Sequence, residues 1–211
     1  MTKASRLAMP LGEAIFSLRA IRRFRTDPIP DSDLRDIMEA AIRAPNGGNA
    51  QPWHFIVIKD PELRTRFAPL YREAWWAKRK DEGIHGPEDI PPGKGTHRSA
   101  MRLADEIGQA PVIVLVCATA KGAGAMASVI PSVQNLLLAA RSLGVGGTIT
   151  TLHAQTAERI HQLFGIPGSA QVVYCVPLGY PLGTFGPVTR KPLAEVCTYE
   201  RWGGPAVVES T

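Results

Sequence analysis

The sequence predicts a single α+β domain in which helices alternate with short apolar strands. Its 211 residues suffice for one domain that buries roughly 70% of its unfolded surface. Four short apolar runs, three of them rich in β-branched residues, lie between longer segments of helical periodicity, and no segment repeats. The three cysteines, Cys117, Cys175 and Cys197, lack the spacing of a metal site, so we expect free thiols in a reducing compartment.

Two helices and one strand are expected in the first 60 residues. A short helix over residues 11–19 follows residues 1–9, which we expect to be disordered. Residues 31–44 place apolar side chains on one stripe of a helix that Asp31 or Ser32 would cap and Pro45 would end. Residues 55–58 are apolar and β-branched, which predicts a buried strand.

The region 61–109 is expected to hold two helices and a lid. A helix over residues 61–80 would begin on Pro61 and carry Trp75 and Trp76 near its end. Residues 81–95 contain three prolines and four glycines, so they predict a loop that is longer than an ordinary connector. Loops of this length are often lids. A second helix follows over residues 96–108.

Three strands and two helices are expected in the second half. The strands are residues 111–118, 145–150 and 170–177, and the helices are residues 125–143 and 154–164. The run 111–118 is apolar throughout, which predicts burial on both faces. The helix 125–143 is apolar nearly all round, which is typical of a domain centre or a subunit interface.

A loop between the second helix and the first strand carries three side-chain amides and two glycines. The amides belong to Asn46, Asn49 and Gln51, and Gly47 lies among them. Amides donate and accept hydrogen bonds at once, so the loop suits a flat heterocycle with alternating donors and acceptors. A connecting loop whose amides only satisfy their own turns is the plainer interpretation.

An arginine-rich segment precedes this loop. Four arginines occupy seven positions, at 19, 22, 23 and 25, and Ile21 and Phe24 between them must be buried. The arginines are therefore held against the body of the protein, where a phosphate could bridge them. A solvated basic face is the alternative.

Together these segments resemble the flavin-dependent nitroreductase family. Its members carry an R-[SA]-x-R-x-F segment, matched by residues 19–24, and an A-P-[SN]-x-x-N-x-Q-P-W-x-F segment, matched by residues 44–55. The resemblance continues over residues 134–146 and 190–196 and is weakest between residues 61 and 109. Ala20 stands where many members have a phosphate-binding serine, so one hydroxyl contact is in doubt.

The resemblance implies a central mixed or antiparallel sheet packed between helices, and a homodimer with shared active sites. It implies FMN as cofactor and NADPH or NADH as hydride donor. Asn46, Gly47, Asn49 and Gln51 would approach the flavin from the partner subunit. The phosphate would lie on the arginine segment and the C-terminal stretch, and a third stretch would lie near the flavin's N5 and O4. The residues expected to bind the phosphate are Arg19, Ala20, Ile21, Arg22, Arg23, Arg190 and Lys191. The residues expected near N5 and O4 are Thr150, Thr151 and Leu152.

The implied activity is reduction of nitroaromatics, quinones or similar flat electron-poor acceptors by ping-pong hydride transfer. The chain shows no nucleophile and base pair and no metal-ligand pattern, so we assign no catalytic side chain and no metal. The reactive atom would belong to the cofactor. His54 fits a strand-edge residue better than an acid. A non-catalytic flavin-binding protein is an alternative.

A second alternative is a Rossmann-type oxidoreductase that binds NADP. Residues 122–127 match G-x-G-x-x-A before a helical segment. However, no acidic residue occurs between Glu106 and Glu158 to hold a ribose, although Arg141 could serve a 2′-phosphate.

Charge and hydropathy bound the partners. A net charge of +5 and a pI near 9.3 suit anionic ligands, and the basic residues are not interleaved with stacking aromatics, so an anionic cofactor fits better than nucleic acid. The apolar run 110–120 is too short to span a membrane, and residues 1–9 do not resemble a signal peptide. We therefore expect a cytoplasmic protein.

Overall fold

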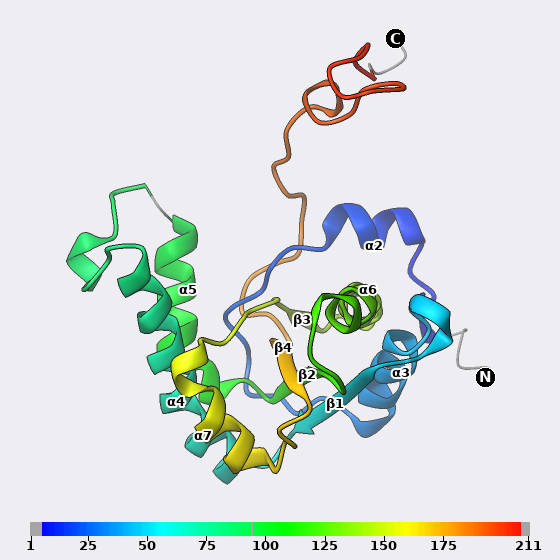
Figure 1. The fold of residues 1–211 in the computed structure, drawn as a ribbon. Helices are drawn as coiled ribbons and strands as arrows, with labels where there is room; N and C mark the ends of the chain where they lie inside the picture. The colour runs from blue at the N-terminus through cyan, green and yellow to red at the C-terminus, as the bar shows by residue number, and fades with distance from the viewer. Residues whose placement is uncertain (1–5, 94, 208–211) are drawn as a thin grey trace.

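The computed structural model describes residues 6–93 and 95–207, and within them the chain forms a sheet covered by helices on both faces (Figure 1). The helices are α2 (Leu11–Ser17), α3 (Asp31–Ala41), α4 (Pro61–Asp81), α5 (Gly95–Glu106), α6 (Ala123–Ser142) and α7 (Ala154–Phe164). The strands are β1 (Trp53–Ile58), β2 (Val112–Ala118), β3 (Gly146–Gly147) and β4 (Gln171–Gly179). Single 3-10 turns occur at Gly47–Asn49, Pro87–Asp89, Ile107–Gln109 and Leu193–Glu195.

The sheet has the order β1-β2-β4-β3, and every neighbouring pair is antiparallel. The α+β class is thus confirmed, with the antiparallel form of the two expected. A Rossmann unit requires parallel strands joined by a crossover helix, so that alternative is wrong. Gly122, at φ 111°, only begins α6. Arg141 donates to Ser17 Oγ at 2.9 Å, and its guanidinium lies 4.2 Å from the ring centroid of Phe185.

β2 lies in the centre of the molecule, and all seven of its residues are buried, as its apolar sequence predicts. Because side chains alternate along a strand, Val112, Val114 and Val116 join the core formed with α3 and α6. Ile113 and Leu115 face the opposite core, formed with α4, α5 and α7. The sheet is therefore buried on both faces at its centre.

β1 and β3 differ from expectation. β1 is an edge strand, and only Ile58 of its six residues is fully buried, whereas the sequence predicted a buried strand. The third strand, expected over residues 145–150, is formed only by Gly146 and Gly147, with one further bridge at Thr150. A Cβ at Gly146 would lie 2.6 Å from Ile21 Cγ1, so glycine is required for the arginine segment to pack there.

The ends of α3 also differ. Pro30 occupies the N-cap position and no side chain caps the helix, so the capping role expected for Asp31 or Ser32 is wrong. The helix ends at Ala41, before Pro45 could stop it. The segment expected to be disordered falls partly outside the described residues, at positions 1–5. Arg6, which is described, pairs with Asp33 and with Asp36 at 2.7 Å.

The loop between α4 and α5 is folded back onto the protein. Ile90 is buried in the core formed with α4 and α5. Asp89 Oδ2 accepts from the His85 and Gly86 amides at 2.8 and 3.1 Å. Position 94, within the expected lid, lies outside the described residues.

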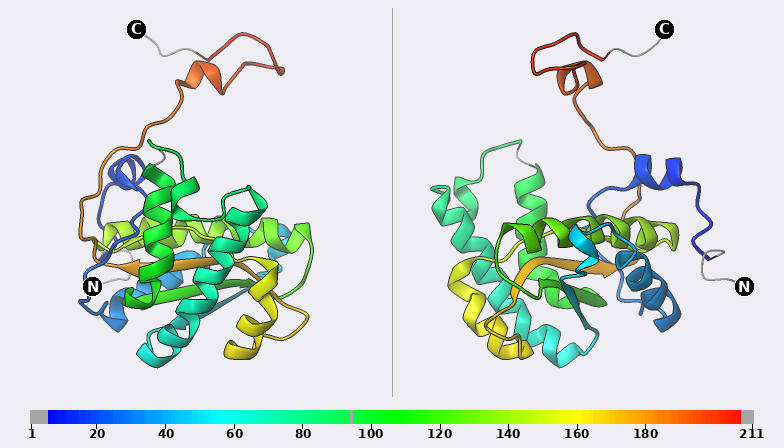
Figure 2. Two further views of the ribbon diagram at one scale, coloured as in Figure 1. Left: turned by 90° about the vertical axis from the view of Figure 1, so that its left-hand side faces the viewer. Right: turned by 45° about the vertical axis from the view of Figure 1, so that its right-hand side comes forward.

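The C-terminal tail projects from the body beyond residue 186, where the ribbon turns orange and red (Figures 1 and 2). Gly186 N donates to Ser17 O at 3.2 Å, which fixes the base of the tail. Farther out, a bridge between Thr198 and Ala206 closes a small turn on which Trp202 is fully exposed.

Among the described residues, α6 is long and apolar enough to cross a membrane by length and composition. The core helix of a soluble protein passes the same test. Seven α6 residues, including Val129, Val133 and Leu136, are buried, most of them against β2 and α3.

Candidate functional site

The arginine segment crosses the end of the sheet in an extended conformation. Ile21 N donates to Gly147 O at 2.9 Å, and Arg25 N donates to Tyr180 O at 2.8 Å. Ile21 is buried at 7% exposure, as the sequence predicts, whereas Phe24 is only half-buried. The backbone is thereby fixed, and the arginine side chains are presented from a rigid support.

Arg19, Arg22 and Arg23 line a cavity of about 280 Å³. Its walls are Arg19, Ala20, Ile21, Arg22, Arg23, Ser99, Leu182, Gly183 and Thr184. Within the described part of the chain, no carboxylate pairs with these three arginine side chains, whereas Arg25 pairs with Asp27 at 2.9 Å. Three guanidiniums without acidic partners are a donor set that fits a phosphate.

Arg22 is the most buried of the three arginines that line this cavity. Its side chain is half-buried, and burial lowers the pKa of its guanidinium from the ordinary value. The charge interaction with Tyr71, which is buried on α4, raises that pKa. Burial raises the pKa of the Tyr71 hydroxyl in turn.

The stretch 150–152 is held from two sides. Thr150 exchanges backbone hydrogen bonds with Cys175 on β4 at 3.0 and 2.8 Å, and its hydroxyl donates to Cys175 O at 2.7 Å. On the other side, Lys78 Nζ of α4 donates to Thr151 O and, at 3.1 Å, to Thr151 Oγ1. The arginine segment passes close by, because Ile21 N donates to the carbonyl of Gly147, three residues before Thr150.

The amide loop lies elsewhere, against the N-terminal half of α6. Gly47 N donates to Ser128 Oγ at 3.2 Å, and Gln51 N donates to Asn46 Oδ1 at 2.8 Å. Gln51 Nε2 donates to Asn49 O at 3.5 Å. Two of the three amides are therefore used within the loop, as the plainer interpretation requires.

The same loop is held in an unusual backbone conformation. Positive φ angles occur at Gly48 (59°), Asn49 (51°) and Gln51 (48°). Such angles are uncommon for residues other than glycine and cluster at functional sites. Of the two glycines in the loop, only Gly48 has a positive φ.

Arg190 and Lys191 lie on the projecting tail. The only described hydrogen bond of the Arg190 side chain runs from Nη1 to Thr189 O at 2.9 Å. Neither residue lines the arginine cavity of its own chain. In a single chain the predicted residues therefore form three separate groups: the cavity with its neighbouring stretch, the amide loop, and the tail.

Several residues near the cavity carry no signal in the sequence. Ser99 comes from α5, and Leu182 and Thr184 follow β4. Lys78, which binds Thr151, lies on α4 and belongs to neither of the two family segments. They converge through tertiary contacts, which local patterns do not encode.

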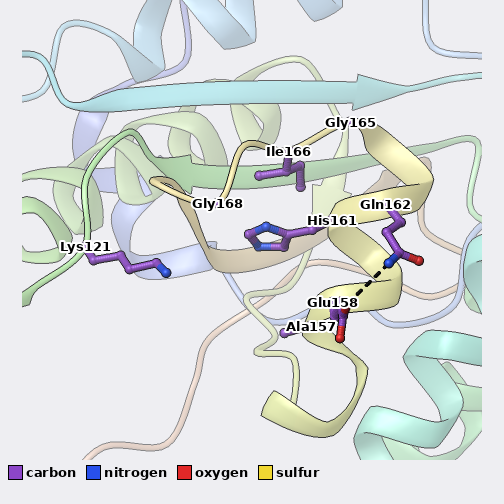
Figure 3. Close-up of a pocket in the computed structure, with 8 residues that line it drawn as sticks. All are labelled: Lys121, Ala157, Glu158, His161, Gln162, Gly165, Ile166 and Gly168. Atoms are coloured by element: carbon purple, nitrogen blue, oxygen red, sulfur yellow. Dashed lines mark hydrogen bonds between the residues drawn. The ribbon is translucent and has the colours of Figure 1, made fainter.

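A larger open hollow of about 580 Å³ lies beside α7 (Figure 3). His161 of α7 and Lys121 project into it, while Gln162 is hydrogen-bonded to Glu158 at 3.3 Å. It shares no lining residue with the arginine cavity and contains none of the predicted site residues. Size alone does not make it the site.

A model of the nitroreductase family matches residues 15–180, which span the arginine segment, the amide loop and the stretch 150–152. The chain belongs to the nitroreductase family. The expected resemblance is confirmed, and family membership makes the chain an oxidoreductase.

Named relatives agree with this family. The chain is 32% identical over 195 residues to the NADH dehydrogenase of Thermus thermophilus. The alignment covers 87% of this chain and 92% of the relative. It is 25% identical to iodotyrosine deiodinase 1 of Rattus norvegicus, over 87% of this chain and 67% of that protein.

Solved structures share the fold. An iodotyrosine deiodinase bound to FMN and 3-iodo-L-tyrosine superimposes with a TM-score of 0.76 at 22% identity, covering 92% of this chain and all of that chain. An FMN-dependent nitroreductase from Mycobacterium smegmatis in complex with NADPH gives a TM-score of 0.70 at 20% identity, over 94% and 100% of the two chains.

Proposed function

We propose that this nitroreductase-family chain binds FMN and uses NADH or NADPH to reduce flat electron-poor acceptors such as nitroaromatics or quinones. The observation that carries the proposal is the arginine cavity, where three guanidiniums without a carboxylate partner in the described chain lie on a fixed backbone. FMN and nicotinamides are also the groups named in the solved relatives.

The chain's own residues would bind and orient this cofactor. Arg19, Arg22 and Arg23 would neutralise the phosphate, and the Ile21 backbone, held by Gly147, would fix their spacing. The stretch from Thr150 to Leu152 would contact the ring. FMN would supply the hydride chemistry, which accounts for a site without an acid and base pair.

The arrangement in one chain favours a homodimer with shared sites. The amide loop and the tail residues Arg190 and Lys191 do not reach the arginine cavity of their own chain, so a second copy would have to supply them. Exposed large apolar side chains support this assembly, because apolar side chains gathered on a surface often mark an interface. They include Leu11, Ile15 and Phe16 on α2, Met126 and Ile130 on α6, and Trp202 on the tail.

Purification and steady-state kinetics test the proposal. The protein should purify yellow and release FMN on heating. With NADH or NADPH and a quinone acceptor, initial-rate plots at several donor concentrations should give parallel lines, because one site serves both substrates in turn. Added salt should raise the donor's KM more than it lowers kcat, because it screens the basic surroundings.

Two outcomes would contradict the proposal. A colourless protein that cannot be reconstituted with FMN would show that FMN is not its cofactor. Binding of FMN without turnover by either nicotinamide would leave a non-catalytic flavin-binding protein. Intersecting lines would contradict only the ping-pong order, since they require both substrates to bind together.

We place this activity in the cytosol, in keeping with the two buried free thiols at Cys117 and Cys175.

A further inference from the structure

The last turn of α4 holds the stretch next to the arginine cavity at two points. Lys78 Nζ donates to the carbonyl and the hydroxyl of Thr151. Three residues later, Asp81 Oδ2 lies 3.1 Å from His153 Nε2. His153 Nδ1 accepts from Gln155 N at 3.2 Å and so caps α7. Leu152 is therefore fixed from both of its neighbours.

The peptide that joins Thr151 to Leu152 has a defined direction. Its carbonyl points toward the Lys78 ammonium. Because a trans peptide is planar and its C=O and N–H point in opposite directions, the Leu152 N–H points away from Lys78. An ammonium that binds the carbonyl also polarises the peptide, which strengthens the N–H at its other end as a donor.

That donor has no partner inside the described chain. The N–H groups of Thr151 and Leu152 donate to no acceptor within residues 6–93 and 95–207. Backbone N–H groups that lack an internal partner bind water or a ligand. The Lys78 ammonium is itself partly removed from water, since burial is the largest cause that lowers its pKa.

We infer that Lys78 is a positioning residue that aims the Leu152 N–H at the bound flavin's N5. The inference rests on the proposed function, because it requires FMN beside the stretch 150–152. The sequence suggests only that a backbone donor occurs in this stretch. Of the two unpartnered N–H groups, that of Leu152 belongs to the peptide whose carbonyl binds Lys78, so its orientation depends on a lysine 74 positions earlier.

A comparison of FMN with 5-deaza-FMN tests this inference by binding alone. The analogue carries C–H in place of N5 and cannot accept the hydrogen bond. If the bond contributes about 1 kcal/mol, the wild type should bind FMN roughly fivefold more tightly than the analogue. Lys78→Met should reduce this preference to less than twofold, and Lys78→Arg, which keeps charge and donors, should restore most of it.

Lys80→Met is the matched control, since Lys80 lies in the same helical turn with an exposed side chain. Affinities are measured by flavin fluorescence. The preference of the wild type for FMN over 5-deaza-FMN, divided by the same preference of the Lys78→Met variant, gives the coupling between Lys78 and N5. Thermal unfolding of the apo proteins shows whether each variant is folded. If Lys78→Met does not fold, Lys78→Gln replaces it, with an expected preference below threefold.

The outcomes separate the inference from the proposed function. A Lys78→Met variant that binds both ligands more weakly but keeps the fivefold preference would show that Lys78 does not aim the amide. A wild type that binds both ligands equally would overturn the inference while leaving FMN binding intact. A wild type that binds neither ligand would overturn the proposed function instead.

Discussion

Arg22 offers a test in which cofactor binding and protein stability change in different directions. Arg22→Met replaces a half-buried cation that has no carboxylate partner among the described residues with an apolar side chain of similar length. The apo protein should therefore be as stable as the wild type or more stable, because an unpaired charge no longer loses hydration. FMN affinity should fall, because a hydrogen bond to a charged group contributes about 1.5–3 kcal/mol.

The expected size follows from this range. A loss of about 1.5–3 kcal/mol corresponds to a Kd that rises roughly 10- to 150-fold. With FMN at about 100 times the wild-type Kd, binding adds about 2.7 kcal/mol of stability. For a chain of this size that raises Tm by roughly 5–11 °C. After a hundredfold loss of affinity, the same FMN concentration should raise Tm by only about 1–2 °C.

The assay is thermal unfolding of each apo protein with and without FMN. Arg66→Met is the control, because Arg66 is exposed on α4. Arg64 appears suitable from the sequence as a surface residue, but its Nη1 donates to Gly108 O and Ala110 O at 3.0 and 2.6 Å. The reasoning is refuted if Arg22→Met keeps the wild-type FMN-induced shift, or if its apo form unfolds several degrees below the control.

Three further predictions concern the tail, the dimer and the thiols. Arg190→Ala should weaken FMN binding roughly 10- to 150-fold if a partner's tail reaches the cavity, and Arg201→Ala should not. If the two variants have the same Kd for FMN, the tail does not belong to the site. Phe16→Glu, on the exposed face of α2, should lower the sedimenting mass at micromolar concentration, whereas Arg35→Glu on α3 should leave it unchanged; a wild-type monomer that binds FMN would contradict the dimer. At pH 8 one thiol per chain should react rapidly with an aromatic disulfide, and none after Cys197→Ser. Burial raises the pKa of Cys117 to about 11, so little reactive thiolate forms below that pH, and rapid titration of two thiols would show that this residue is accessible.

Local sequence determined most of the helices and the central strand. The start of α4 on Pro61 and the span of α7 follow from local periodicity and capping. The apolar run of β2 predicted burial on both faces because polar residues are absent from either side of the strand. The arginine segment was also predictable, since Ile21 and Phe24 had to be buried and the arginines between them had to follow the backbone.

Tertiary structure decided which segments meet. Glycine is needed at positions 146 and 147 because Ile21 and Leu178, which lie far away in the sequence, pack directly against them. The contact between Lys78 and Thr151 likewise joins the end of one helix to the loop before another. Local propensities act over a few residues, whereas these contacts form only once the layers have packed. The family motifs therefore predicted candidate site residues. Only the folded chain showed that the arginine segment lies close to the stretch 150–152, while the amide loop and the tail residues lie apart from the arginine cavity.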